Sequence, residues 1–127
     1  MKLTIHDPEG IYPSAPDYVH ALEVEGSRRI LFVSGTMGLD AAGAAPATLD
    51  EQLERVWVNI RRILASAGMS VDNIVRQTSY LTEASFADAN AKARVAALHG
   101  RLIPTTAIVV QTLVSSWLIE IEIIAAA

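Results

Sequence analysis

The sequence contains no cysteine among its 127 residues. This absence excludes disulfide bridges, thiolate nucleophiles and Cys-ligated zinc. Its three histidines, His6, His20 and His99, lie far apart and lack the spacing of a metal-binding motif. No P-loop, GxGxxG or GxSxG motif occurs either. We therefore expect a protein with no metal and no cofactor.

Positive charge and long apolar runs are also scarce. The formal net charge is -4, which repels phosphate backbones, so we expect no nucleic acid partner. No apolar run approaches the length that spans a bilayer, and the first ten residues lack the apolar stretch of a signal peptide. These features predict a cytoplasmic protein with no membrane partner.

The apolar composition indicates a folded α+β domain built from aliphatic side chains. Hydrophobic residues make up 51% of the chain and aromatic residues only 6%. No repeat or low-complexity tract marks a boundary, so we expect one domain, residues 1–127. A domain of this size buries only about two-thirds of its unfolded surface by itself. A partner subunit is one source of further burial.

A first helix is predicted where apolar residues recur at helical spacing between a start signal and a stop signal. Thr48 with Glu51 three residues later forms a capping pattern, and Gly68 ends the run. A second helix is expected from Ser85 and Asp88 to Gly100, with Lys92 and Arg94 on its wetter side.

Runs rich in β-branched residues predict the strands. They cover residues 2–5, 18–24, 29–34, 74–81, 105–111 and 118–125. Gly26-Ser27 separates the second and third runs, which we interpret as a hairpin that the first run joins. Two helices suffice to cover one face of such a sheet, which predicts a two-layer α+β fold.

The second face of the sheet also avoids water. Residues 30–33 and 107–110 are apolar at successive positions, so both faces of these strands carry apolar side chains. A partner subunit is the simplest cover. The alternative is that these are short edge segments whose exposure is tolerated.

Two pairs of polar residues are candidates for a site. Tyr18 and His20 project to one face of a predicted strand and could form a pocket wall, or they could be half-exposed strand residues. Glu120 and Glu122 also share a face, about 7 Å apart along the strand. They are either a solvated outer face or, beneath a partner, a general acid or base.

Several strings in order along nearly the whole chain resemble the RidA/YjgF family. They are APDYVHALEV, FVSGTMGLD, Gln52 and Asn59 in the first helix, VRQTSYLTE, Pro104 and WLIEIEIIA. The resemblance implies a chorismate-mutase-like two-layer domain with a mixed β-sheet and two helices on one face. It also implies a homotrimer with a cleft at each subunit boundary.

The family's site residues transfer to this chain with one departure. In deaminating members an arginine two residues after the proline binds the carboxylate of a 2-imino acid while water attacks the C=N carbon. Here that position is Thr106. The resemblance implies Glu120 as the catalytic residue. The expected substrate-binding residues are Tyr18, Ser34, Gly35, Thr106, Ile108 and Arg101.

The loss of the arginine at Thr106 bears on the substrate. Each charge-assisted hydrogen bond of a guanidinium fork contributes about 1.5 to 3 kcal/mol, so capture of a 2-imino acid should weaken on the order of a hundredfold or more. Arg101, five residues upstream, either replaces the missing group or is a solvated loop residue.

We therefore expect a protein that hydrolyses an imine or enamine other than 2-iminobutanoate or 2-iminopropanoate. The alternative is a non-catalytic trimer that binds a small metabolite between subunits. A third activity attached to the family, endoribonuclease, fits least, because the chain is acidic and has no paired histidines or basic aromatic face.

Overall fold

Four strands form the main sheet in a computed structural model that describes residues 1–127. Their order is β3 (Ile30–Met37), β6 (Ile119–Ala126), β4 (Ile74–Leu81) and β5 (Thr105–Val109). β4 and β5 run parallel, whereas β6 is antiparallel to both of its neighbours. The sheet is therefore mixed, as predicted.

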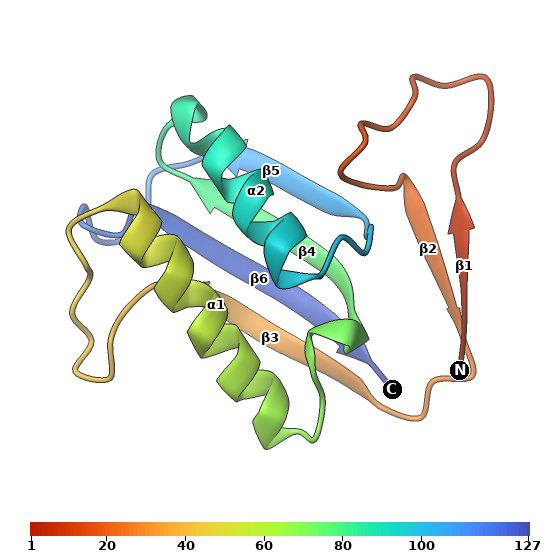
Figure 1. The fold of residues 1–127 in the computed structure, drawn as a ribbon, viewed down its shortest axis with the longest axis horizontal. Helices are drawn as coiled ribbons and strands as arrows, with labels where there is room; N and C mark the ends of the chain where they lie inside the picture. The colour runs from red at the N-terminus through yellow and green to blue at the C-terminus, as the bar shows by residue number, and fades with distance from the viewer.

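Two helices cover one face of this sheet (Figure 1). They are α1 (Leu49–Ser66) and α2 (Ala87–Ala97), and short 3-10 turns at Val71–Asn73 and Ala84–Phe86 precede β4 and α2. The predicted two-layer α+β fold with both helices on one side is confirmed. None of the helices is both long and apolar enough to cross a membrane.

The core lies between the helices and the sheet. Ile119, Ile121 and Ile123 alternate along β6, and each is at most 1% exposed. They belong to one apolar cluster with Trp57 and Ile60 of α1. Burial of each such side chain stabilises the fold by about 1.5–3 kcal/mol, so the period-2 pattern of β6 fixes which face meets the helices.

The first helix begins where the sequence predicted. The Thr48 hydroxyl oxygen accepts a hydrogen bond from the Glu51 N–H at 3.3 Å and donates one to the Glu51 carboxylate at 3.0 Å. After the helix, Gly68 adopts a φ of +68°, a conformation that glycine accepts without strain.

The predicted start of the second helix is wrong. Ser85 lies in the preceding 3-10 turn and donates to the Glu83 carboxylate at 3.2 Å, and no side chain caps the first turn of α2. The prediction for Arg94 is also wrong, because it is 4% exposed and bound to Asp17. Lys92 is exposed, as expected.

The predicted hairpin between the second and third strands is not formed. Instead β2 (Ala21–Glu25) pairs with β1 (Lys2–His6) in a separate two-stranded ribbon, which lies beside the main sheet in Figure 1. The N–H groups of Arg28 and Arg29 both donate to the Ala127 carbonyl, at 2.8 and 2.9 Å. The chain that enters β3 is thus paired with the end of β6, and the outer edge of β3 stays open.

The face of the main sheet opposite the helices is uncovered within one chain. It exposes large apolar side chains, with Ile30 57%, Phe32 74% and Ile108 47% exposed. The expected homotrimer stays a prediction, but these residues give the open face the apolar character from which it was inferred.

Candidate functional site

The open face also gathers polar side chains near its centre. β4 contributes alternate residues from one side of its backbone and β6 contributes two glutamates, all half-buried. These residues are Arg76, Thr78, Tyr80, Glu120 and Glu122. The register places Tyr80 beside Glu120 and Thr78 beside Glu122. Two strands distant in sequence therefore build one polar patch.

A β-bulge in β3 shapes the border of this patch. Val33 pairs with Ile123 and Thr36 pairs with Ile121, so Ser34 and Gly35 together face the single residue between those isoleucines. Bulges bend a strand and redirect its side chains, and they are frequent next to active sites. The two residues of the bulge are thus Ser34 and Gly35, both of which were expected to bind substrate.

Gly35 lies directly against the side chain of Glu120. A Cβ atom at position 35 would overlap the Glu120 carboxylate and lie 2.8 Å from its Cδ. Any larger residue would force that carboxylate to move. The glycine therefore allows this close approach of two predicted site residues.

The two glutamates line a cavity of about 330 Å³, which we call the glutamate cavity. Its other lining residues are Gly35, Tyr80 and residues 110–113. No side chain or backbone group of the chain donates a hydrogen bond to the Glu120 carboxylate. That carboxylate can therefore accept a hydrogen bond from water or a ligand.

Tyr80 holds the second glutamate in place. Its hydroxyl donates to Glu122 Oε1 at 2.7 Å. This hydrogen bond is the main cause that raises the pKa of Tyr80 above its ordinary value of 10.0. Desolvation and the charges of Glu122 and Glu120 add to the rise, while the charge of Arg76 opposes it. The four side chains thus share one electrostatic environment.

Gln52 anchors the chain shortly after residues 110–113, which line the glutamate cavity. Its amide nitrogen donates to the carbonyls of Pro46 and Ser116 at 2.9 and 2.8 Å, and its amide oxygen accepts from the Leu118 N–H at 2.9 Å. It therefore ties the segment between β5 and β6 to α1. A glutamine among the apolar positions of a helix was the sequence signal for this role.

Arg76 is a site residue that the sequence did not reveal. Its guanidinium Nη2 donates to the Thr106 hydroxyl oxygen at 2.6 Å. Arg76, Thr78 and Glu122 line a second cavity of about 200 Å³ together with Phe32, Val33, Ile123 and Ile124. We call it the arginine cavity. A cation from the neighbouring strand therefore lies beside the position where the family arginine is missing.

Ile108, the other expected substrate-binding residue on β5, also lies on the open face. Ile108 pairs with Tyr80, and Thr106 pairs with Thr78. The polar patch thus continues from β4 onto β5, with an exposed apolar side chain next to the tyrosine.

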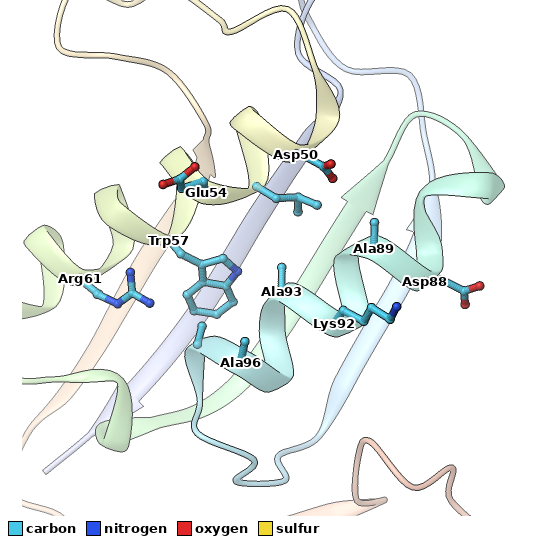
Figure 2. A pocket seen from close by; sticks show the side chains of 11 residues that line it. Asp50, Glu54, Trp57, Arg61, Asp88, Ala89, Lys92, Ala93 and Ala96 are labelled. Carbon is cyan, nitrogen blue, oxygen red and sulfur yellow. The ribbon is translucent and has the colours of Figure 1, made fainter.

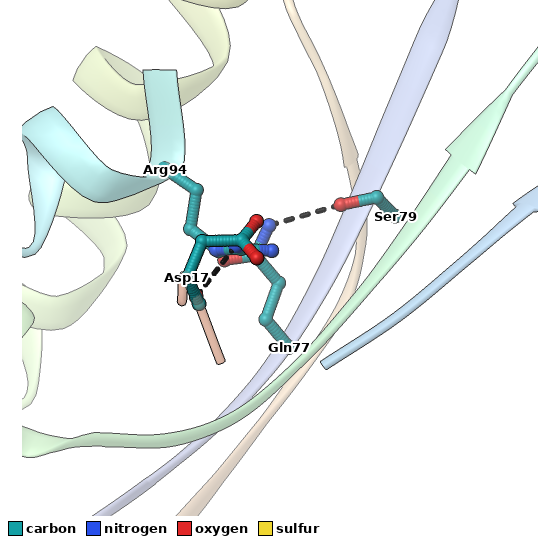
Figure 3. A network of polar contacts seen from close by, with 4 residues as sticks. All are labelled: Asp17, Gln77, Ser79 and Arg94. Carbon is teal, nitrogen blue, oxygen red and sulfur yellow. Dashed lines mark hydrogen bonds and ion pairs between the residues drawn. The ribbon is translucent and has the colours of Figure 1, made fainter. Parts of the chain in front are cut away.

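Tyr18 is not brought to Glu120 within one chain. It lies before β2, with its ring 5.9 Å from that of His20 in an edge-to-face contact. Its neighbour Asp17 accepts two hydrogen bonds from the buried Arg94 guanidinium, to its carbonyl at 2.8 Å and its carboxylate at 2.7 Å (Figure 3). This anchors the segment to α2, near the start of β5.

Arg101 is engaged elsewhere. It donates to the carbonyls of Val71 and Ile74 at 2.8 and 2.7 Å, and burial lowers its pKa. These contacts are at the start of β4, and Arg101 lines neither cavity on the open face. Within this chain it does not replace the missing arginine.

A larger groove of about 600 Å³ lies between α1 and α2 (Figure 2). Its walls include Trp57 and Ala93, and charged side chains such as Glu54, Arg61 and Lys92 surround it. None of the predicted site residues lines this groove. The open face of the sheet is therefore the better candidate for a site.

Known proteins that resemble this chain support the family suggested by its fold and by its sequence segments. The family model described as Endoribonuclease L-PSP matches residues 11–127. A RutC family protein from Aquifex aeolicus is 35% identical over 80 residues, which cover 62% of this chain and 61% of that protein. The matched part thus spans less than two-thirds of that relative.

Solved structures of the Rid family match the whole chain. The Rid family protein YyfB from Yersinia pestis has a TM-score of 0.86 and 28% identity, with all of both chains covered. RidA from the Antarctic bacterium Psychrobacter sp. PAMC 21119 has a TM-score of 0.73 and 26% identity over 98% of each chain. The chain belongs to the RidA/YjgF family.

Proposed function

We propose that this protein is a homotrimer that hydrolyses an imine or enamine other than the usual 2-imino acids, in a cleft between subunits. The observation that supports this most is the unpartnered Glu120 carboxylate, which lies over Gly35 in the glutamate cavity. A carboxylate in a partly enclosed cavity is suited to act as a general base toward water.

The reaction consists of adding water to a C=N bond. Glu120 accepts a proton from water as the water oxygen bonds to the imine carbon, and it passes this proton to the nitrogen. In the second step Glu120 accepts the proton of the new hydroxyl group and returns it to the amine, so that the C–N bond breaks, ammonia leaves and a carbonyl remains. Glu120 acts on the proton that moves, and Tyr80 keeps Glu122 hydrogen-bonded at 2.7 Å beside it.

The proposed assembly completes the cleft. Phe32 and Ile30 are more than half exposed on the face that carries the cavities, and a second copy of the chain would remove them from water. Tyr18 lies away from Glu120 in its own chain, so its expected role requires a neighbouring subunit to supply it.

A non-catalytic, metabolite-binding trimer is the second candidate. The exposed Ile108 beside the polar residues of the open face favours it, because ligand sites combine apolar walls with a few polar groups. An endoribonuclease fits least, because two glutamates line the glutamate cavity and repel phosphates.

The test measures ammonia release from a panel of imines and enamines by the wild type and by Glu120→Gln. We expect turnover of at least one compound by the wild type, with a loss of a hundredfold or more in the variant, on the order expected for a general base. Glu54→Gln, on α1, is the matched control. No turnover together with ligand-dependent thermal stabilisation would support the binding protein instead.

A further inference from the structure

Arg76 is the one cation on the open face whose charge has no partner. Its guanidinium lies within hydrogen-bonding distance of the neutral Thr106 hydroxyl, and no carboxylate lies within 4 Å of it. A guanidinium carries five N–H donors in a planar fork, so the bond to Thr106 leaves donors free. The half-buried side chain is thus able to bind an anion.

The surroundings of Arg76 allow a carboxylate on an apolar chain. The arginine cavity combines Arg76 and Thr78 with apolar side chains such as Phe32 and Ile124, and Glu122 lines it as well. Its volume of about 200 Å³ holds a group of a few atoms. A planar guanidinium matches a carboxylate with two parallel hydrogen bonds, and the apolar walls exclude water around them.

The two cavities adjoin. Glu122 lines both of them, and Tyr80 holds it in place at 2.7 Å. A ligand that extends from one cavity to the other therefore passes a fixed negative charge. That charge repels a carboxylate in either cavity, so an acidic group is favoured only where the Arg76 guanidinium binds it directly.

The register sets the separation between the two ends. Arg76 reaches the level of Thr106 and Thr78, whereas Glu120 lies at the level of Tyr80, two residues further along β4. Two residues of a strand span about 7 Å. In a 2-imino acid the carboxylate is bonded directly to the imine carbon and cannot reach both ends.

We propose that Arg76 and Thr106 form a carboxylate-binding subsite, so that the substrate is an imine or enamine whose acidic group is several bonds from the C=N carbon. This inference rests on the proposed function for the chemistry at Glu120. The subsite itself can be tested by binding without turnover.

The binding test uses two isomeric keto acids that resemble hydrolysis products. In 6-oxoheptanoate the carboxylate is far from the carbonyl, and in 2-oxoheptanoate it is adjacent. We expect the wild type to bind 6-oxoheptanoate about tenfold more tightly or better in calorimetry, a factor of ten being what part of one charge-assisted pair provides. Arg76→Met should remove this preference.

Three further variants separate the contributions of the charge, the fork geometry and the Thr106 hydroxyl from a general effect of removing an arginine. Arg76→Lys should retain part of the affinity, because it keeps the charge and loses the fork. Thr106→Val, which removes the hydroxyl that holds the guanidinium, should weaken binding less than Arg76→Met. Arg61→Met, on the exposed side of α1, should bind like the wild type.

Two results would overturn the subsite. One is equal binding of 6-oxoheptanoate by the wild type and Arg76→Met. The other is a smaller assembly mass in Arg76→Met, which would make the arginine an interface residue. Failure of every imine assay with the binding preference intact would reject the proposed function and leave the subsite standing. Turnover that does not change when Arg76 is replaced would support the proposed function and reject the subsite.

Discussion

The two faces of β6 differ in what they contribute. Ile119, Ile121 and Ile123 point to the helices and are at most 1% exposed, while Glu120 and Glu122 point to the open face. Because side chains alternate along a strand, one segment supplies both the centre of the core and the centre of the candidate site. Core residues and candidate site residues thus alternate along β6.

The largest expected effect comes from the face of β6 that packs against the helices. Ile121→Ala should lower the free energy of unfolding by about 2–5 kcal/mol, because it leaves a cavity against α1. Urea denaturation measures this change. Its neighbour Glu122→Gln should cost clearly less, because that side chain is half-buried on the open face. Equal losses would show that the two faces do not differ as described.

The second prediction concerns the bulge. Gly35→Ala puts a methyl group where the Glu120 carboxylate lies, so the carboxylate must move. We expect imine turnover to fall about tenfold or more with little change in stability, because the end of the Glu120 side chain has no hydrogen-bond partner in the chain and moves aside. Ser85→Ala, in the exposed turn before α2, is the control for both measurements. Full activity in Gly35→Ala would separate Gly35 from the site.

The smallest effect concerns Tyr80. Its raised pKa means that the folded state favours the neutral phenol. This contribution to stability is present below about pH 10 and is lost as the pH rises through the raised pKa. A near-ultraviolet titration should show one of the three tyrosines ionising after the others, and Tyr80→Phe should abolish that late step. Persistence of the step would place the perturbed group elsewhere.

The sequence predicted features that follow from a local period or a local cap. The alternation of β6 located both its core and its glutamates, and Thr48 located the start of α1. Contacts between side chains on different strands leave no such pattern in the sequence. Arg76 lies in the strand predicted over residues 74–81, and nothing in the sequence of that strand showed that its guanidinium reaches Thr106.

The errors have the same origin. An apolar run such as β2 can pair with either neighbour, and the bonds from Arg28 and Arg29 to Ala127 that accompany the observed pairing are long-range. Arg94 was assigned to the wet side of α2 because arginine is usually exposed, yet Asp17, 77 residues away, accounts for its burial.

We infer that the open face of the sheet is the functional face and that other copies of the chain cover it. The most direct test is the mass of the assembly by sedimentation velocity for the wild type, Phe32→Glu and, as a control on the helix layer, Arg61→Glu. We expect three times the 13.6 kDa chain mass for the wild type and the control, and 13.6 kDa for Phe32→Glu. A monomeric wild type, or a Phe32→Glu variant that assembles normally, would contradict it.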